Sequence, residues 1–267
     1  MWIDTHCHLD AAEFGAEAPA VAARAGGRGV AMIVIPAVEK ANFPIVKQLA
    51  ASVVNATYAL GIHPIFVPQA SEDDLAALRT EVEAALADPR FVAIGEIGLD
   101  FFIPMLNQPA MRDKQEFFFR EQLRIARDFG LPALMHVRRS QDMVLKHLRQ
   151  VRPAGGIAHA FNGSFQQAQT YIDLGFRLGF GGAMTFTRAL QIRRLASDLP
   201  LSSIVLETDA PDISPSWIQP GRNSPEQLPR IGATLAELRG LGVGEVEAAT
   251  EANARAAIPR LGLSLPG

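Results

Sequence analysis

The sequence lacks several features that mark particular classes of protein. It has one cysteine, Cys7, in 267 residues, which excludes an intramolecular disulfide and fits a reducing compartment. Its 25 Lys and Arg residues are balanced by 28 Asp and Glu residues, a formal net charge of −3, so no large basic field is available to hold long duplex nucleic acid. The longest apolar run, Val30 to Val38, is too short to span a bilayer, and the amino terminus has neither the basic nor the apolar region of a signal peptide. We therefore expect a cytoplasmic location, no membrane partner and no obligate protein partner.

What the sequence does contain is a repeated alternation of short aliphatic runs with stretches of helical periodicity. Apolar residues make up 48% and charged residues 20%, which excludes disorder and coiled coil. Eight strands are predicted, near residues 2–8, 31–36, 57–63, 91–99, 131–137, 156–161, 176–181 and 203–209. This pattern is typical of an α/β protein with one (β/α)₈ barrel, predicted to occupy residues 1–267 as a single domain. A doubly wound sheet would have a glycine-rich loop after its first strand, and residues 9–12 are Leu-Asp-Ala-Ala.

Two histidines, His6 and His8, end the first predicted strand. Because side chains alternate across a strand, both imidazoles point to the same face, which in a barrel is the interior. A pair of hydrogen-bonded core histidines is the simpler interpretation, but two neutral imidazoles side by side are hard to satisfy in a core. We therefore interpret the pair as candidate metal ligands.

Residues with metal-binding side chains end four other strands, and they are Glu96, His136, His159 and Asp209. Alternation places Glu96 on the face of Val92 and Ile94, where a buried carboxylate needs a partner for its charge. The carboxyl ends of barrel strands converge on the active site of this fold. Four imidazoles and two carboxylates exceed the needs of one metal and predict two divalent ions bridged by a carboxylate. Imidazole favours Zn²⁺, Mn²⁺, Fe²⁺ or Co²⁺ over Mg²⁺, and the spacing does not choose among them.

Six short motifs occur in order along nearly the whole chain, at residues 6–10 (HCHLD), 61–64 (GIHP), 95–100 (GEIGLD), 134–138 (LMHVR), 159–164 (HAFNGS) and 207–211 (ETDAP). They resemble the successive motifs of the TatD family of metal-dependent deoxyribonucleases. The resemblance implies a barrel of the metallo-dependent hydrolase type that hydrolyses DNA phosphodiesters with divalent metals, typically as an exonuclease. It also implies that one metal is held by His6, His8, Glu96 and Asp209, and the other by Glu96, His136 and His159. Glu96 would then bridge the two ions.

Three segments depart from the commonest pattern of this family. Residues 101–107 have phenylalanine where tyrosine is common, residues 138–142 have a second arginine, and residues 180–185 differ from the usual loop. The pattern therefore resembles a less characterised branch, with the metal-site motifs intact. Phe101, Phe102 and Trp217 belong to loops that we expect to border the site, where a ring could stack a terminal base or simply pack within its loop.

Three more residues are candidates for contacts around the metals. His63 is either a contact to substrate phosphate or to a metal ligand, or a strand-end histidine bonded to a carbonyl. Arg138 could grip a phosphate or form a surface ion pair, whereas Arg139 is expected to point outward. Glu207 could orient a metal ligand or a water molecule, or it could be a buried carboxylate paired for structural reasons.

The primary hypothesis is a deoxyribonuclease that cleaves single-stranded DNA or strand ends by a two-metal mechanism. Asp209 is the candidate acceptor of the proton from the attacking water, and Glu96, which would hold both ions, is the other catalytic candidate. The alternative is a binuclear-metal hydrolase of an ester, lactone or amide in a small molecule or aminoacylated nucleotide. Substitution of Arg138 should distinguish the two hypotheses, because it should reduce activity on a phosphodiester much more than activity on a neutral ester. A third hypothesis is a barrel without catalytic activity, in which at least one metal-ligand position would hold a residue that cannot bind metal. Here all six positions hold histidine, glutamate or aspartate.

Overall fold

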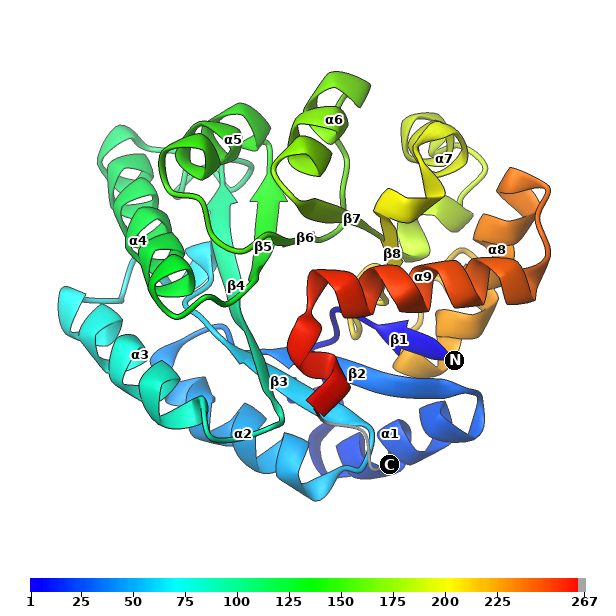
Figure 1. Cartoon of the computed structure of the whole chain (residues 1–267), viewed down its shortest axis with the longest axis horizontal. Coiled ribbons are helices and arrows are strands. Elements are labelled where there is room, and N and C mark those ends of the chain that lie inside the picture. Colours follow the sequence, from blue (N-terminus) through cyan, green and yellow to red (C-terminus); the bar gives the residue numbers. More distant parts are fainter. Residues whose placement is uncertain (264–267) are drawn as a thin grey trace.

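The chain forms a barrel of eight parallel strands that follow one another in sequence order (Figure 1). We describe residues 1–263 of a computed structural model. The strands are β1 (Trp2–Asp4), β2 (Val30–Pro36), β3 (Ala56–Leu60), β4 (Phe91–Asp100), β5 (Ala133–Arg138), β6 (Gly156–Ala158), β7 (Phe176–Phe180) and β8 (Ile204–Leu206). The predicted (β/α)₈ barrel is confirmed. Its predicted extent, residues 1–267, includes residues 264–267, which lie outside the described residues, so the extent stays a prediction.

Hydrogen bonds between the first and last strands bring the two ends of the sheet together. The Thr5 N–H donates to the Leu206 carbonyl at 3.1 Å, and the Asp209 N–H donates to the His6 carbonyl at 2.8 Å. Two predicted metal ligands, His6 and Asp209, are therefore joined through their backbones although 203 positions separate them in the sequence.

Helices surround the barrel (Figure 1). They are α1 (Ala18–Gly27), α2 (Phe43–Ser52), α3 (Glu72–Ala85), α4 (Pro109–Asp128), α5 (Gln141–Gln150), α6 (Phe165–Asp173), α7 (Leu190–Asp198), α8 (Leu228–Arg239) and α9 (Val243–Ala257), with short 3₁₀ helices that include η3 (Pro64–Phe66) and η7 (Pro259–Leu263). Ser71 and Ser164 each form a reciprocal capping box, which satisfies backbone N–H groups at the start of α3 and α6. No helix within residues 1–263 combines the length and apolar character needed to span a membrane.

The apolar core has two parts. Large side chains between the strands and the helices form an outer cluster, and a smaller inner cluster fills the barrel. The inner cluster combines strand residues such as Met32, Val92 and Ile157 with residues of α9 and η7, among them Ile258 and Leu261. Figure 1 shows α9 crossing one end of the barrel. Because these C-terminal residues close the amino end of the barrel, the carboxyl ends of the strands are left to form the site.

The structure corrects two local expectations about the strands. Val92 packs in the inner cluster but Ile94 packs in the outer one, so the prediction that Glu96 shares a face with both residues is wrong for Ile94. The reason is a register shift between β3 and β4 over Phe91 to Ala93, which interrupts the alternation between Val92 and Ile94. In addition, β1 and β8 end earlier than predicted, so that His6, His8 and Asp209 follow their strands in irregular segments.

We predict that shortening a buried side chain at the amino end of the barrel lowers the stability of the fold. This residue lies away from the candidate site. Leu261 is fully buried in the inner cluster, and Leu261→Ala should lower the free energy of unfolding by about 2–5 kcal/mol because it leaves a cavity. Val54, 75% exposed, is the control, and Val54→Ala should change that free energy by less than about 0.5 kcal/mol. Urea titration followed by circular dichroism measures both, and equal effects would contradict this account of the closure.

Candidate metal centre

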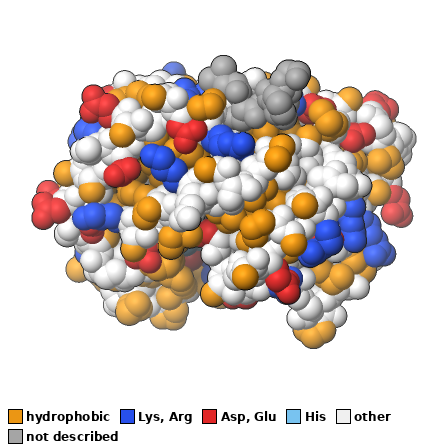
Figure 2. All heavy atoms as spheres, turned by 90° about the horizontal axis from the view of Figure 1, so that it is seen from below, with side chains coloured by type: hydrophobic (Ala, Val, Ile, Leu, Met, Phe, Trp, Pro, Cys, Tyr) orange, Lys and Arg blue, Asp and Glu red, His pale blue; other side chains and the backbone are white. Residues whose placement is uncertain are grey.

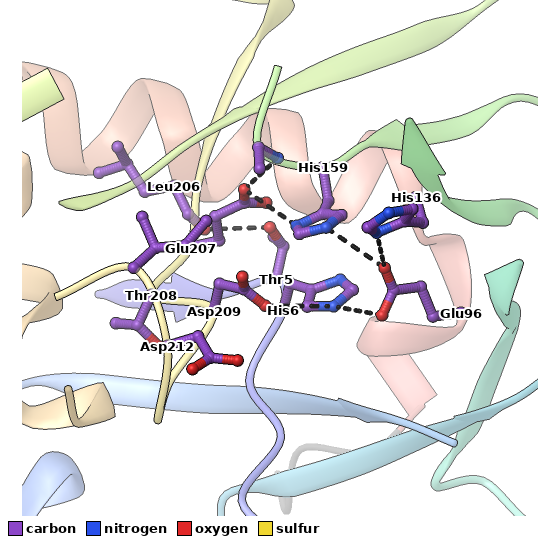
Figure 3. A network of polar contacts seen from close by, with 12 residues as sticks. Thr5, His6, Glu96, His136, His159, Leu206, Glu207, Thr208, Asp209 and Asp212 are labelled. Carbon is purple, nitrogen blue, oxygen red and sulfur yellow. Dashed lines mark hydrogen bonds and ion pairs between the residues drawn. The ribbon is translucent and has the colours of Figure 1, made fainter. Parts of the chain in front are cut away.

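The candidate site is a cavity of about 910 Å³ at the carboxyl ends of the strands. It is lined by loops from around the barrel and includes His8, His63, Glu96, Asp100, Phe102, His136, Arg138, Arg139, His159, Glu207 and Asp209. His6 lies fully buried in contact with Glu96 at 3.1 Å. The structure thus brings together all six predicted metal ligands, and Figure 3 shows the imidazoles of His6, His136 and His159 turned toward the Glu96 carboxylate.

Glu96 is the centre of this cluster, and its two oxygens face different groups of imidazoles. Oε2 lies 3.1 Å from Nε2 of His6 and 3.2 Å from Nε2 of His8. Oε1 lies 3.0 Å from Nδ1 of His136 and 3.3 Å from Nε2 of His159. Burial alone would raise the pKa of the Glu96 carboxyl, yet the surrounding imidazoles hold that pKa well below its ordinary value. The carboxylate is therefore ionised and can bind a cation through each oxygen.

The first group has the dimensions of a tetrahedral metal site. The Nε2 atoms of His6 and His8 are 3.3 Å apart, and each lies 3.7 Å from Oδ1 of Asp209. With the two distances to Glu96, these contacts run from 3.1 to 3.7 Å. A tetrahedron with metal–ligand bonds of about 2.0–2.1 Å has edges of about 3.3–3.4 Å. Two imidazole nitrogens aimed at one another and at two carboxylates therefore fit a divalent cation.

In the second group, hydrogen-bond partners set which ring nitrogen is available to a metal. Nε2 of His136 lies 3.2 Å from Oδ2 of Asp100 and Nδ1 lies 3.0 Å from Oε1 of Glu96, so a proton kept on Nε2 would leave Nδ1 to bind a metal. Nδ1 of His159 faces Oε1 of Glu207 at the ion-pair distance of 3.5 Å, and its Nε2 points to Glu96. A carboxylate behind each imidazole is the usual arrangement for metal-bound histidine. That Glu207 orients His159 stays a prediction.

His63 also approaches the Glu96 carboxylate, but the ring nitrogen that faces Glu96 carries a proton and not a free lone pair. Its Nε2 lies 3.4 Å from Oε1 of Glu96, and its Nδ1 accepts a hydrogen bond from the Ile65 N–H at 3.0 Å. Burial lowers the pKa of His63 to about 4, so the ring is neutral at pH 7. A neutral ring that accepts at Nδ1 carries its proton on Nε2 and donates there. His63 is therefore suited to donate a hydrogen bond into the cavity, as the predicted contact to substrate requires, and less suited to bind a metal.

The arginines and aromatic residues differ in part from expectation. Arg138 is half exposed, with Nη1 3.8 Å from Oδ2 of Asp100 and its guanidinium 3.8 Å from the centre of the Phe102 ring. Arg139 was expected to point outward, but it lines the cavity and lies 4.7 Å from the same ring. The cause is a left-handed backbone at Arg139, with φ 55°, which breaks the alternation after β5.

Two of the three aromatic residues expected at the border of the site lie elsewhere. Phe101 is buried beneath Arg112, and Trp217 donates to Gln227 at 2.9 Å and lies against Arg230 rather than lining the cavity. These loop side chains pack against nearby helices, as the simpler interpretation held. Phe102 alone of the three lines the cavity, and it is 43% exposed.

Three further residues have a place in the site, and sequence reasoning assigned no role to two of them, Asp100 and Gly179. Asp100 contacts His136 through Oδ2, and its Oδ1 accepts hydrogen bonds from two N–H groups of the next loop. Asp4 accepts from the backbone and hydroxyl of Thr208, which holds the segment before Asp209. Gly179 lies under Glu207, where a Cβ would overlap the carboxylate. Only Asp100 had a signal, because it ends the quoted motif at residues 95–100.

We predict that metal affinity rises with pH between pH 6 and 8. Although burial lowers it, hydrogen bonding to Glu96 and nearby carboxylate charges raise the pKa of His8 to about 9 in the metal-free site. His8 is therefore protonated below pH 9 and must release that proton to become a ligand. Affinity should increase about tenfold per pH unit for each proton released. Calorimetric metal titration in buffers of different ionisation enthalpy measures the proton count, and an affinity independent of pH would contradict the ligand role of His8.

We predict that Gly179→Ala weakens metal binding by displacing the Glu207 carboxylate from behind His159. Metal affinity should fall about 10- to 100-fold, as for other changes behind a metal ligand. Gly27→Ala is the matched control, because a Cβ there meets no atom within 4 Å. Metal titration of both variants measures the difference. Unchanged affinity in Gly179→Ala would show that the position of Glu207 is irrelevant to the site.

Comparisons with known proteins agree with this geometry. The sequence pattern of the TatD-related DNase family matches residues 3–259. The metal-dependent hydrolase YjjV of Escherichia coli K12, itself uncharacterized, is 40% identical over 239 residues, which cover 89% of this chain and 90% of that protein. The 3′-5′ ssDNA/RNA exonuclease TatD of Klebsiella pneumoniae is 30% identical over 259 residues, 94% of this chain and 95% of that protein.

The fold comparison points to the same relatives. The crystal structure of the Escherichia coli TatD homologue YjjV superposes with a TM-score of 0.90 and 37% identity, covering 97% of this chain and 98% of that one. A TatD-family hydrolase from Entamoeba histolytica superposes with a TM-score of 0.83 at 18% identity, a likeness of fold. The chain therefore belongs to the TatD-related DNase family and is a metal-dependent hydrolase.

Proposed function

We propose that this chain hydrolyses phosphodiester bonds in single-stranded DNA, or at the ends of DNA strands, with two divalent metal ions. The observation that carries the proposal is the position of Glu96, whose two oxygens face two separate groups of imidazoles. Two ions about 3.5–4 Å apart are the usual centre of enzymes that hydrolyse phosphodiesters by in-line displacement. The similarity to the Klebsiella exonuclease supports the same chemistry and, with it, digestion from the 3′ end.

The residues around Glu96 supply a ligand set for each ion. His6, His8 and Asp209 complete the set at Oε2, and His136 with His159 completes the set at Oε1. When bound, divalent ions would polarise the substrate phosphate and lower the pKa of water toward about 7. The chain's share is to hold the ligands in place, since each of these imidazoles is held by contacts with carboxylates.

Asp209 is placed to accept the proton of the attacking water. Its Oδ1 faces His6 and His8, which leaves the second carboxylate oxygen free for another partner. Burial raises the pKa of Asp209 to about 6 in the metal-free site, and a bound cation would lower that pKa. The role proposed for Asp209 rests on the position of its second oxygen, since a proton acceptor must lie within hydrogen-bond reach of the proton.

Two further side chains are placed to hold the phosphate. His63 donates from Nε2 into the space beside Glu96, where it can bind a phosphate oxygen. Arg138 adds a guanidinium at the rim, next to the Asp100 carboxylate that also contacts His136. A guanidinium pairs with phosphate through two parallel hydrogen bonds, so Arg138 favours an anionic substrate over a neutral ester.

On one face of the molecule, the described residues do not form the continuous basic surface that binding along a duplex would need. On the face seen in Figure 2, Lys and Arg side chains lie in separate small groups among apolar and acidic side chains. Binding along a duplex would require many such side chains to neutralise successive phosphates. A substrate end that enters the cavity needs only the few donors that line it.

We predict that metal-loaded protein shortens 5′-labelled single-stranded DNA, and that excess chelator abolishes this activity. Asp209→Asn should lower kcat by about 10²- to 10⁴-fold, because it removes the proton acceptor. Arg138→Gln should raise the KM for DNA about 10- to 100-fold, because a charged hydrogen bond to phosphate is lost. Product ladders from labelled DNA, labelled RNA and a p-nitrophenyl ester give the rates.

The same assay tests the rival substrate class. A neutral ester hydrolysed faster than DNA, with a rate unaffected by Arg138→Gln, would replace the nuclease with a small-molecule ester or amide hydrolase. Nuclease activity that survives both chelator and Asp209→Asn would rule out the metal mechanism. His147→Gln is the control, since His147 is paired with Glu116 and does not line the cavity.

A further inference from the structure

Two consecutive arginines and one phenylalanine form a distinct wall of the cavity. The guanidinium groups of Arg138 and Arg139 lie 3.8 and 4.7 Å from the centre of the Phe102 ring. All three residues line the cavity and are exposed at its rim. A guanidinium held against a ring keeps the N–H groups on its edge available for a ligand. We call these three residues the arginine wall.

The backbone is built to turn both arginines to the same side. Consecutive residues of an extended chain point in opposite directions, but Arg139 has φ 55°, in the left-handed region that a non-glycine residue rarely occupies. Hydrogen bonds flank it, because the Phe101 N–H donates to the Arg138 carbonyl at 2.9 Å and Ser140 Oγ donates to the Leu99 carbonyl at 2.7 Å. The left-handed backbone is strained for an arginine, and these contacts hold the segments on both sides of it.

Asp100 connects the arginine wall to the metal centre. Its Oδ2 lies 3.2 Å from Nε2 of His136 and 3.8 Å from Nη1 of Arg138. Its Oδ1 accepts from the N–H groups of Phe102 and Ile103 at 2.8 and 3.1 Å, which holds the loop that carries the ring. Arg138 therefore lies one side chain away from a metal ligand, and Arg139 follows it along the rim.

Arg139 has no anionic partner within the described residues. No carboxylate of residues 1–263 lies within ion-pair distance of its guanidinium, whereas Arg138 has Asp100 nearby. An unpaired cation that lines a cavity and is held in a strained backbone is available to bind an anion. In the proposed function, the first metal group and Arg138 bind the phosphate that is cleaved. Arg139 is therefore available to bind another phosphate.

The opposite side of the cavity has the opposite charge. The loops after β1 and β8 contribute Asp10, Glu13 and Asp212 to the lining. In a barrel with strands in sequence order, β1 and β8 lie across from β4 and β5, whose loops carry the arginine wall. A polyanionic chain that leaves the metal centre is repelled by the acidic side and attracted to the arginine wall.

We propose that Arg139, braced by Phe102 beside Arg138, binds a second phosphate group of the substrate, one nucleotide away from the phosphate that is cleaved. This inference rests on the proposed function and narrows its substrate class. The preferred substrate is a nucleic-acid strand with at least two phosphates, either a longer chain of diesters or a short end that carries a terminal phosphomonoester.

The test compares substrates that differ by one phosphate. Metal-loaded wild type and Arg139→Gln are assayed on d(TpT), which has one phosphate, and on d(TpTpT), d(pTpT) and d(TpTp), which have two. Arg139→Gln should raise KM about 10- to 100-fold more for at least one of the two-phosphate substrates than for d(TpT), with kcat little changed. The three two-phosphate substrates distinguish an internal diester from a 5′ or a 3′ phosphomonoester.

A matched control is available in the same chain. Arg194 also lies against a phenylalanine ring, Phe165, at 5.3 Å, but it is paired with Asp198 and does not line the cavity. Arg194→Gln should leave all four KM values as in wild type. An equal rise in KM for one- and two-phosphate substrates in Arg139→Gln, or no rise at all, would overturn the proposal.

Failure of the proposed function gives a different result. In that case wild type does not hydrolyse d(TpT) or any longer substrate, whatever residue occupies position 139. Calorimetric binding of d(TpT) and d(TpTpT) to metal-loaded wild type and Arg139→Gln then tests the second phosphate by itself. A preference for d(TpTpT) that Arg139→Gln abolishes supports the phosphate site, and equal binding of both ligands by wild type overturns it.

Discussion

The contact of the buried Glu96 carboxylate with five imidazoles from four parts of the barrel is the interaction on which the rest of the site depends. A carboxylate that is 1% exposed is stable only if positive charge or hydrogen-bond donors surround it. Here the donors come from residues of β5 and of the segments after β1, β3 and β6, so the barrel must close before the charge is compensated. The same arrangement that makes Glu96 tolerable in the metal-free protein also presents converging ligands to a cation.

The barrel fold and the positions of the candidate metal ligands could be predicted from the sequence, because they depend on local sequence patterns. Eight aliphatic runs separated by helical periodicity indicate a barrel, and the carboxyl ends of its strands must meet. Any ligand that ends a strand, such as His136, is then in the site wherever the strand lies in the chain. Irregular extensions of β1 and β8 did not disturb this result, since His6 and Asp209 are held together by their own backbone groups.

The remaining features depend on tertiary packing that no local rule contains. A register shift in the pairing of β4 with β3 separates Val92 from Ile94, and it becomes visible only once the two strands are paired. The orientation of Arg139 depends on one left-handed residue, for which an arginine gives no signal. The proton position on His63 follows from a backbone N–H two residues away, which sequence reasoning could not place.

Closure of the barrel through His6 and Asp209 links assembly of the metal centre to the order of synthesis. His6 and His8 are synthesised before the other ligands, and Asp209 follows only after all eight strands have been synthesised. The backbone N–H of Asp209 contributes to the seam between β1 and β8, and its carboxylate faces the His6 imidazole, so the same residue takes part in closing the barrel and in completing the ligand set. A nascent chain therefore has a partial ligand set, and a divalent cation binds most tightly to the finished barrel. The metal would thus favour the closed barrel over partly folded states by its own binding free energy.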